Sequence, residues 1–275
     1  MNSKLTFVLI IAVGVINKMS GQNFTNQSNS SFIDPLSVQS LFIEQVDAKN
    51  EIFGCATGFV FEYNSKYYLI TNWHVVTGRD PSNNQIIDKQ GRIPTSLQIW
   101  HNAEKIGAWE SRIEPLYEKK KKLWIEHPKG KDVDVVALPL TIIDSVIKIY
   151  PFNLKLAETD MVPMVGMPVS IIGFPQCMSG PGKMAIWKTG HIATEPDIDF
   201  NGEPFFIIDA TTRQGMSGSP VVLRLTSGYK TMSGSSMMAT SGMTTKFLGI
   251  YSGQNFANEL GKVWFPKVIL EILKQ

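Results

Sequence analysis

Short apolar runs, rich in β-branched and aromatic residues and bounded by Gly, Pro, Asn or Asp, recur along the chain. Runs at 59–63 and 67–71 are separated by Asn64-Ser65-Lys66, a spacing typical of a hairpin. Six further runs have the same character, at 97–100, 133–138, 169–173, 205–208, 220–225 and 247–251. Because these brief strands do not alternate with helical periods, the pattern predicts an all-β sandwich or barrel and argues against a parallel α/β sheet.

The C-terminus departs from this pattern. After Pro266, apolar residues follow the i, i+1, i+4, i+5 spacing of one helix face, at Val268, Ile269, Ile272 and Leu273. This spacing predicts one short amphipathic helix. Two polar stretches, 78–130 and 226–246, are expected to form surface loops.

The first 21 residues have the layout of a secretory signal peptide, with Lys4, then a run of low polarity from 5 to 16, then small or polar residues near Ser20. A helix that crosses a bilayer needs about 20 apolar residues, and this run is shorter. We therefore expect residues 1–21 to be a signal peptide and the protein to be secreted or periplasmic, with an uncleaved membrane anchor as the alternative. Residues 22–40 begin with a tract of Asn, Ser, Thr and Gln and are expected to be a polar linker or a removable pro-segment.

Composition and charge narrow the function classes. The chain has 275 residues, 43% of them hydrophobic and 18% charged, which is typical of a globular protein with a large core and room for two lobes. Loss of residues 1–21 would remove Lys4 and Lys18 and no acid, so 26 basic residues would become 24 against 24 acidic ones. Such a near-neutral body lacks the electrostatic footprint of a nucleic-acid-binding protein.

The cysteine and histidine counts limit the kinds of site the chain can carry. Cys55 and Cys177 are the two cysteines, which excludes a disulfide-rich scaffold and a four-cysteine zinc site. In an oxidising compartment the two could form one bridge, and the sequence leaves open whether they meet. His101 and His127 lie in the polar stretch without a second ligand at metal spacing, so neither a metal nor a cofactor is expected.

Three polar positions stand out against the strand pattern. His74 comes just after the run 67–71, a position where a histidine alone is more often structural than catalytic. Asp134 opens an apolar strand, and a buried carboxylate there needs a partner, whereas Asp132 is expected to face water. Ser217 lies in a turn between glycines, where consecutive backbone N–H groups can converge on one point.

Taken together, these residues carry a family resemblance. In the order His74, Asp134, Ser217, the chain resembles the trypsin-like serine peptidases of the chymotrypsin fold and not the α/β-hydrolases, whose serine comes first. The stretch 209–220 is similar to the Asp-Ala and Gly-x-Ser-Gly-x-Pro pattern of bacterial high-temperature-requirement and glutamyl-type peptidases. Three further matches are Thr57-Gly58-Phe59-Val60, Ile172-Gly173-Phe174-Pro175 and Gly249-Ile250-Tyr251-Ser252-Gly253. The resemblance spans about residues 50–255.

The resemblance implies two antiparallel six-stranded β-barrels, over 41–155 and 156–275, with the predicted C-terminal helix in the second. In the cleft between the barrels, Ser217 would be the nucleophile, His74 the general base and Asp134 the group that orients the imidazole. The backbone N–H groups of Gly215 and Ser217 would form the oxyanion hole.

The same resemblance names substrate-binding candidates at Thr211, Tyr251 and Ser252. Thr211 stands where trypsin has the aspartate that binds basic side chains, and Tyr251 stands where glutamate-specific relatives have a histidine, so neither preference is expected. Met216 replaces the aspartate that pairs with a new N-terminal amine in the animal digestive enzymes, so activation by that pairing is not expected. His191 is a possible pocket residue or an ordinary strand histidine.

The sequence therefore predicts a secreted serine endopeptidase that acts on protein or peptide substrates, with no nucleic acid partner, no stable membrane insertion after loss of the signal peptide, and a monomeric state. The alternative is a catalytically silent trypsin-like fold that binds peptides. A Met-rich tract, 232–243, could be a docking surface or a flexible hairpin tip.

Overall fold

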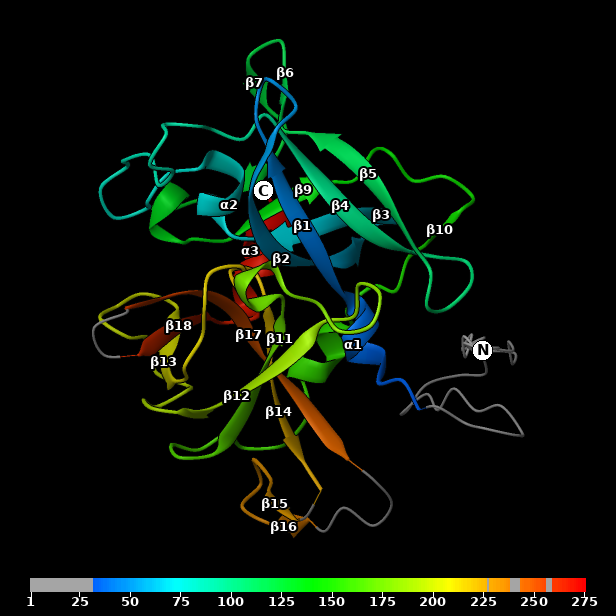
Figure 1. Cartoon of the computed structure of the whole chain (residues 1–275). Coiled ribbons are helices and arrows are strands. Elements are labelled where there is room, and N and C mark those ends of the chain that lie inside the picture. Colours follow the sequence, from blue (N-terminus) through cyan, green and yellow to red (C-terminus); the bar gives the residue numbers. More distant parts are fainter. Residues whose placement is uncertain (1–31, 227, 238–242, 256–258) are drawn as a thin grey trace, which may run out of the picture.

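The computed structural model describes residues 32–275, apart from 227, 238–242 and 256–258. The predicted signal peptide lies outside these residues, as does most of the predicted linker. Two β-structures, formed by the N-terminal and C-terminal halves of the chain, are stacked one above the other in Figure 1. The all-β prediction is confirmed.

The N-terminal half forms one antiparallel sheet of eight strands. Their hydrogen-bonded order is β10-β4-β1-β2-β3-β9-β8, with β5 paired to β4 off this path. The strands are β1 (Ser40–Val46), β2 (Ile52–Tyr63), β3 (Lys66–Thr71), β4 (Ser96–Ala103), β5 (Trp109–Pro115), β8 (Ile125–Glu126), β9 (Val136–Pro139) and β10 (Ile147–Lys148). A separate hairpin joins β6 (Tyr117–Glu118) and β7 (Lys121–Lys122).

The C-terminal half forms a closed six-stranded barrel in the order β11-β12-β13-β18-β17-β14. Its strands are β11 (Pro168–Gly173), β12 (Ile186–Ile192), β13 (Phe205–Asp209), β14 (Pro220–Leu225), β17 (Thr244–Asn255) and β18 (Leu260–Trp264). A small hairpin of β15 (Tyr229–Lys230) and β16 (Ser236–Met237) extends from it. The barrel agrees with the trypsin-like architecture expected for this half.

Helices are few and short. They are α1 (Pro35–Gln39), α2 (Trp73–Thr77) and α3 (Lys267–Leu273), with 3-10 turns η1 (Gly130–Asp132), η2 (Leu154–Ala157) and η3 (Pro175–Cys177). The predicted C-terminal helix is confirmed as α3, whose apolar face packs against β8 and β9 of the N-terminal sheet. No helix in the described part of the chain has the length and apolar character needed to cross a membrane.

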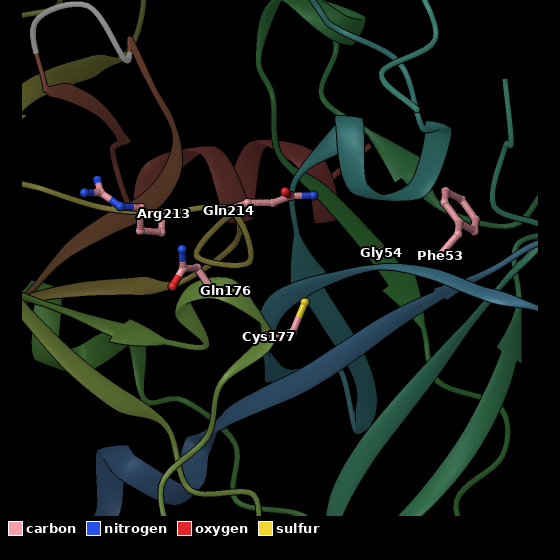
Figure 2. Close-up of a pocket in the computed structure, with 6 residues that line it drawn as sticks. All are labelled: Phe53, Gly54, Gln176, Cys177, Arg213 and Gln214. Carbon is pink, nitrogen blue, oxygen red and sulfur yellow. The ribbon is translucent and has the colours of Figure 1, made fainter. Parts of the chain in front are cut away.

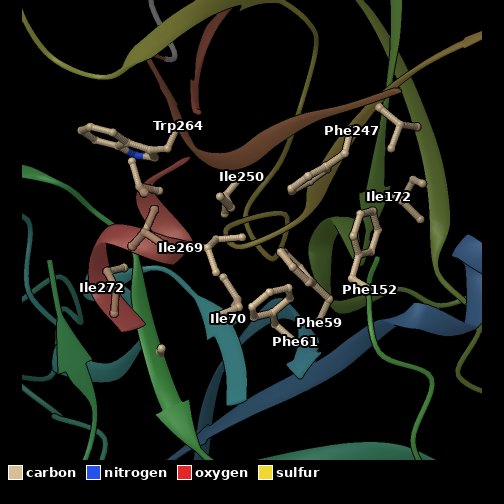
Figure 3. Close-up of a cluster of buried hydrophobic side chains, with 14 of the residues drawn as sticks. Phe59, Phe61, Ile70, Phe152, Ile172, Phe247, Ile250, Trp264, Ile269 and Ile272 are labelled. Atoms are coloured by element: carbon tan, nitrogen blue, oxygen red, sulfur yellow. The ribbon is translucent and has the colours of Figure 1, made fainter. Parts of the chain in front are cut away.

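One hydrophobic cluster joins the two halves (Figure 3). Phe59 of β2 lies 5.0 Å, ring centre to ring centre, from Phe152, and Phe152 lies 4.6 Å from Phe247 of β17. Ile250 and Ile269 bring β17 and α3 into the same cluster. Because burial of such side chains is the main stabilising force in a core, this shared cluster fixes how the two halves sit against each other.

The polar stretch 78–130 is not a surface loop, and the sequence expectation was wrong there. It contains β4 and β5, and Leu97 and Ile99 of β4 are fully buried. In β4, alternate positions supply the core. In β5, Glu110 is exposed, whereas the Glu114 carboxylate is buried and accepts the backbone N–H groups of Thr141 and Ile142. In the stretch 226–246, residues 227 and 238–242 lie outside the described part, so the Met-rich tract is described only at its two ends.

The segment at the N-terminal end of the described chain is folded. Leu36 and Val38 of α1 are buried, and Asp34 pairs with Arg224 of β14. Ser40 then opens β1, which lies between β2 and β4 at the centre of the sheet. The part of the predicted linker from Asp34 onward therefore belongs to the folded body.

Candidate active site

His74 lies in α2, the single turn of helix that follows β3. Gly78 ends this turn in the left-handed conformation (φ 65°), and its N–H donates to the His74 carbonyl at 2.9 Å. At the other end, the Asn72 side chain donates to the backbone carbonyl of Asp134 at 2.7 Å. The helix that carries His74 is thus tied directly to the segment that carries Asp134.

Asp134 is buried and its carboxylate accepts three hydrogen bonds. Oδ1 accepts the backbone N–H of His74 at 2.9 Å, and Oδ2 lies 2.7 Å from Nδ1 of the same histidine. Oδ2 also accepts from Oγ of Ser252 at 2.5 Å. These bonds offset the cost of burying the carboxylate of a residue that is only 3% exposed.

Ser217 contacts the same histidine as Asp134, so the three side chains form a row of contacts. Its Oγ lies 2.8 Å from Nε2 of His74, on the opposite side of the ring from Asp134. The structure therefore brings Asp134 and Ser217 to the His74 side chain, although they lie 60 and 143 positions from it along the sequence. With a proton on Nδ1 donated to Asp134, Nε2 is the acceptor for the serine hydroxyl.

The surroundings of His74 favour its protonated form. Burial acts to lower the pKa of His74, but the negative charge of Asp134 and the hydrogen bond to it raise the pKa, and Asp80 adds a smaller contribution in the same direction. The pKa is consequently above its ordinary value. An imidazole of this kind accepts a proton more readily than one in water.

The turn that carries Ser217, residues 213–219 and called the serine turn below, depends on two glycines. Gly215 and Gly218 have φ of 95° and 85°, values that other residues rarely adopt. A Cβ at Gly215 would lie 2.2 Å from the Phe174 carbonyl, so the position also lacks room for a side chain. Neither the N–H of Gly215 nor that of Ser217 donates to any protein group within the described residues.

Two carbonyls of this turn, those of Gln214 and Met216, are paired. The Gln214 carbonyl accepts from the N–H of Gln176 at 2.6 Å, and the Met216 carbonyl accepts from Ser219 at 3.0 Å. In a planar trans peptide the N–H points away from the carbonyl, so these bonds turn the N–H groups of Gly215 and Ser217 to the opposite side. Those two N–H groups are available to a ligand oxygen.

Cys55 and Cys177 form a disulfide, which settles the question the sequence left open. It links β2 of the N-terminal sheet to η3 of the C-terminal half and lies beside the serine turn, since a Cβ at Gly215 would lie 3.1 Å from the Cys55 sulfur. A cavity of about 410 Å³ adjoins it (Figure 2). The lining residues are Phe53, Gly54, Gln176, Cys177, Arg213 and Gln214.

Two of the predicted substrate-binding residues, Ser252 and Tyr251, have different surroundings from those expected. Ser252 is buried and its hydroxyl donates to the Asp134 carboxylate, so it supports the contact between Asp134 and His74. Tyr251 is 1% exposed, and its hydroxyl hydrogen-bonds with the Thr212 hydroxyl. Burial raises the pKa of Tyr251 to about 12, against the hydrogen bond with Thr212 that lowers it, so the hydroxyl stays neutral.

The third candidate, Thr211, is exposed, and its hydroxyl donates to the Glu259 carboxylate at 3.0 Å. That carboxylate is a neighbour that the sequence did not indicate, because 48 positions separate the two residues.

The remaining histidines lie apart from this site. His127 is buried and lies 2.8 Å from Glu271 of α3, and His101 is buried in β4. His191 is an exposed residue of β12. Within the described ranges, no group of three His, Cys, Asp or Glu side chains is arranged to hold a metal ion.

One family model and several solved structures are similar to this chain. The family model for the trypsin-like peptidase domain matches residues 56–227. Among solved structures, the active form of the Rv3671c protease from M. tuberculosis is 17% identical, covers 87% of this chain and 81% of that chain, and has a TM-score of 0.44. The thermostable serine protease AL20 from an extremophilic microorganism is 11% identical, with coverages of 86% and 95% and a TM-score of 0.49. The MamO protease domain from Magnetospirillum magneticum is 13% identical, with coverages of 86% and 96% and a TM-score of 0.47. A search of curated proteins found no significant match.

Proposed function

The chain belongs to the trypsin-like peptidase domain family, and from that membership we propose that it is a serine endopeptidase whose catalytic residues are Ser217, His74 and Asp134. The observation that carries the proposal is the unbroken row of contacts, 2.8 Å from Ser217 to His74 and 2.7 Å from His74 to Asp134. A nucleophile, a base and a group that orients the base are what acyl transfer requires.

The first half of the reaction forms an acyl-enzyme. Oγ of Ser217 attacks the scissile carbonyl carbon while its proton moves to Nε2 of His74, and Asp134 stabilises the imidazolium that results. The carbonyl oxygen becomes an oxyanion and accepts the free N–H groups of Gly215 and Ser217, each of which contributes about 3 kcal/mol of barrier lowering. The tetrahedral intermediate then collapses, the C–N bond breaks, and His74 gives the proton to the departing amine.

The second half reverses these roles with water. His74 takes a proton from a water molecule that attacks the acyl carbon, and the oxyanion again accepts the two N–H groups. Collapse of this second intermediate returns the proton to Ser217 and releases the acid. The cavity beside Gln176 and Gln214 adjoins the serine turn, and we assign it to the leaving-group side of the substrate.

Peptide hydrolysis by the purified protein tests the proposal. Incubation with an unfolded protein substrate, followed by mass spectrometry of the products, is expected to give new peptide termini with the wild type and none with Ser217→Ala. Equal product from both proteins would remove Ser217 as the nucleophile. Peptide binding without cleavage by the wild type would instead favour the silent binding module.

Export and a monomeric state are part of the same proposal. The layout of residues 1–21 and the near-neutral charge of the remaining chain support a secreted or periplasmic enzyme that acts on proteins or peptides without a nucleic acid partner. N-terminal sequencing of the protein recovered from its producing cells checks this. A mature terminus near residue 22 is expected, and an intact Met1 would contradict removal of a signal peptide.

A further inference from the structure

Thr57 of β2 bonds the serine turn through its hydroxyl and its backbone N–H. Its hydroxyl donates to the Gly215 carbonyl at 2.8 Å and accepts the Phe174 N–H at 3.2 Å. Its backbone N–H donates to the Ser217 carbonyl at 2.9 Å. The residue is fully buried, with 0% of its surface exposed, so water does not replace these bonds.

We propose that Thr57 is a positioning residue that holds the oxyanion hole in its working geometry, an inference that rests on the proposed function. The carbonyls it holds belong to Gly215 and Ser217, the two residues whose N–H groups have no acceptor among the described residues. Fixing both carbonyls fixes ψ of each residue. The hydroxyl acts from the N-terminal sheet on a turn that belongs to the C-terminal half, across 158 positions of sequence.

The residues that form the serine turn explain why it needs a positioning residue. Gly215 has no side chain and a positive φ, so the peptide planes on either side of it rotate easily unless they are held. Met216 is apolar and fully buried, so residue 216 supplies no charge that could anchor the turn. The Gly215–Met216 peptide is held instead by the Thr57 hydroxyl on its carbonyl and by the Arg213 carbonyl on its N–H, the latter at 3.2 Å.

The support for Thr57 extends one residue further from the turn. The Thr71 hydroxyl donates to the Thr57 carbonyl at 2.8 Å, which fixes the peptide that follows Thr57. On the other side, the Thr57 hydroxyl ties Phe174 to the turn, and the Gln176 N–H then holds the Gln214 carbonyl at 2.6 Å. The hydroxyl is therefore the point where β2, the segment after β11 and the serine turn meet.

The matched pair Thr57→Val and Thr57→Ser tests the proposal. Valine keeps the branched shape and loses the hydroxyl, whereas serine keeps the hydroxyl. With a peptide substrate, Thr57→Val is expected to lower kcat about tenfold to a hundredfold. The variant displaces the N–H donors of the oxyanion hole, and this loses only part of the rate that would be lost if a donor were removed. KM should change by less than about threefold, because the oxyanion forms only after binding. Thr57→Ser should retain kcat within about threefold of the wild type.

Inhibition by a peptide aldehyde provides a readout that a structural role alone would not move. The aldehyde forms a tetrahedral adduct on Ser217 whose oxygen occupies the same hole, so Thr57→Val should weaken inhibition by the same factor that it lowers kcat/KM. Thr194→Val is the control, because the Thr194 hydroxyl accepts the Ile207 N–H at 2.9 Å and, within the described chain, has no hydrogen bond to residues 213–219. It should lower the melting temperature and leave kcat unchanged.

Each outcome decides the proposal. A Thr57→Val enzyme that is folded and keeps its kcat overturns it, as does equal loss of kcat in Thr57→Val and Thr57→Ser. If Thr57→Val does not fold, Thr57→Ala makes the same comparison with Thr57→Ser. Failure of the proposed function is seen separately, because it would leave the wild type without turnover.

Discussion

Oγ of Ser252 lies 2.5 Å from Oδ2 of Asp134, the same carboxylate oxygen that faces Nδ1 of His74. The serine comes from β17 of the barrel, while the aspartate and the histidine come from the N-terminal half. Asp134 is therefore held from both halves of the molecule. A shift of one half against the other would change the orientation of the imidazole, so the proposed triad depends on the packing of the two halves.

The Asp134 carboxylate should be needed for turnover. In Asp134→Asn the amide keeps the size of the side chain but presents an N–H where the Nδ1–H of His74 requires an acceptor, so the histidine takes the wrong tautomer. We expect kcat to fall by about 10⁴, the loss typical of this change in a serine triad. Steady-state kinetics measures it. Ser252→Ala, which removes one donor and leaves the acceptor in place, should cost much less, and an equal loss in both variants would contradict the assignment.

Activity should rise with pH through a midpoint above about 6.5, the ordinary value for histidine. The base must be neutral, and although burial lowers the pKa of His74, Asp134 and Asp80 raise it overall. A profile of kcat/KM against pH gives the midpoint for the free enzyme. Asp80→Asn should move this midpoint to lower pH with little change in the plateau. A midpoint below 6 in the wild type would contradict the prediction.

The contribution of His74 to stability should fall as the pH rises, whereas activity rises. Because the pKa of His74 is higher in the folded state, protonation of His74 stabilises the fold. That contribution is fully present below about pH 6.5 and is lost as the pH rises through the folded-state pKa. Melting temperatures of the wild type and His74→Ala, compared at pH 5.5 and 8.5, measure it. The melting temperature of the wild type minus that of His74→Ala should be larger at pH 5.5 than at pH 8.5.

The Cys55–Cys177 disulfide should be a large contributor to stability. It closes a loop of 122 positions, and the chain-entropy model gives about 4 to 5 kcal/mol for a loop of that length. The double variant Cys55→Ala/Cys177→Ala should lower the free energy of unfolding by an amount in this range, measured by urea denaturation. Wild type treated with a reductant is the matched control and should agree with it. A loss below about 1 kcal/mol would show that the folded halves do not depend on the bridge.

The side chain next to the cleaved bond should be small. The backbone of Tyr251 pairs with Gly218 and Ser219 at 2.9 Å, and its ring crosses to Thr212 on the segment before the nucleophile. The ring also lies where Gly261 has no side chain, 2.5 Å from the position of a Cβ. We therefore predict that the buried, neutral Tyr251 ring limits the depth available to a substrate side chain beside Ser217.

A peptide library measures this preference. The wild type is expected to favour Ala, Ser, Thr or Val at the cleaved residue, and Tyr251→Val should extend cleavage to Leu and Phe. Tyr251→Phe keeps the ring and should keep the preference, which separates the effect of the ring from that of the hydroxyl. A wild-type preference for Lys or Arg would contradict the prediction and would point to Glu259, the carboxylate that contacts Thr211.

The strands that the sequence predicted are those with continuous apolar runs, such as β3 and β14. It missed β12 and β18, where Lys188, His191 and Lys262 interrupt the apolar pattern, because one side of each strand faces water. It also did not foresee that β4 and β5 pair along seven positions inside the polar stretch 78–130. Pairing of this kind depends on the partner strand, which local pattern does not reveal.

The three residues of the proposed triad could be chosen from sequence because their local signals, weak one by one, occur in the order of a known family. His74 follows a strand, Asp134 opens an apolar run, and Ser217 lies between glycines whose positive φ the turn requires. Ser252 and Thr57 have no such signal, since a lone hydroxyl in a strand is ordinary. Their roles come from contacts across 118 and 158 positions, which only the folded chain brings together.

Labelling with a fluorophosphonate probe tests the central claim most directly, because the probe reacts with a serine only when an adjacent base has activated it. The wild type should be labelled at a single position, and peptide mapping should locate the label on Ser217, with no label on Ser217→Ala and strongly slowed labelling of His74→Ala. Labelling that persists in Ser217→Ala, or a folded wild-type protein that takes up no label, would contradict the account.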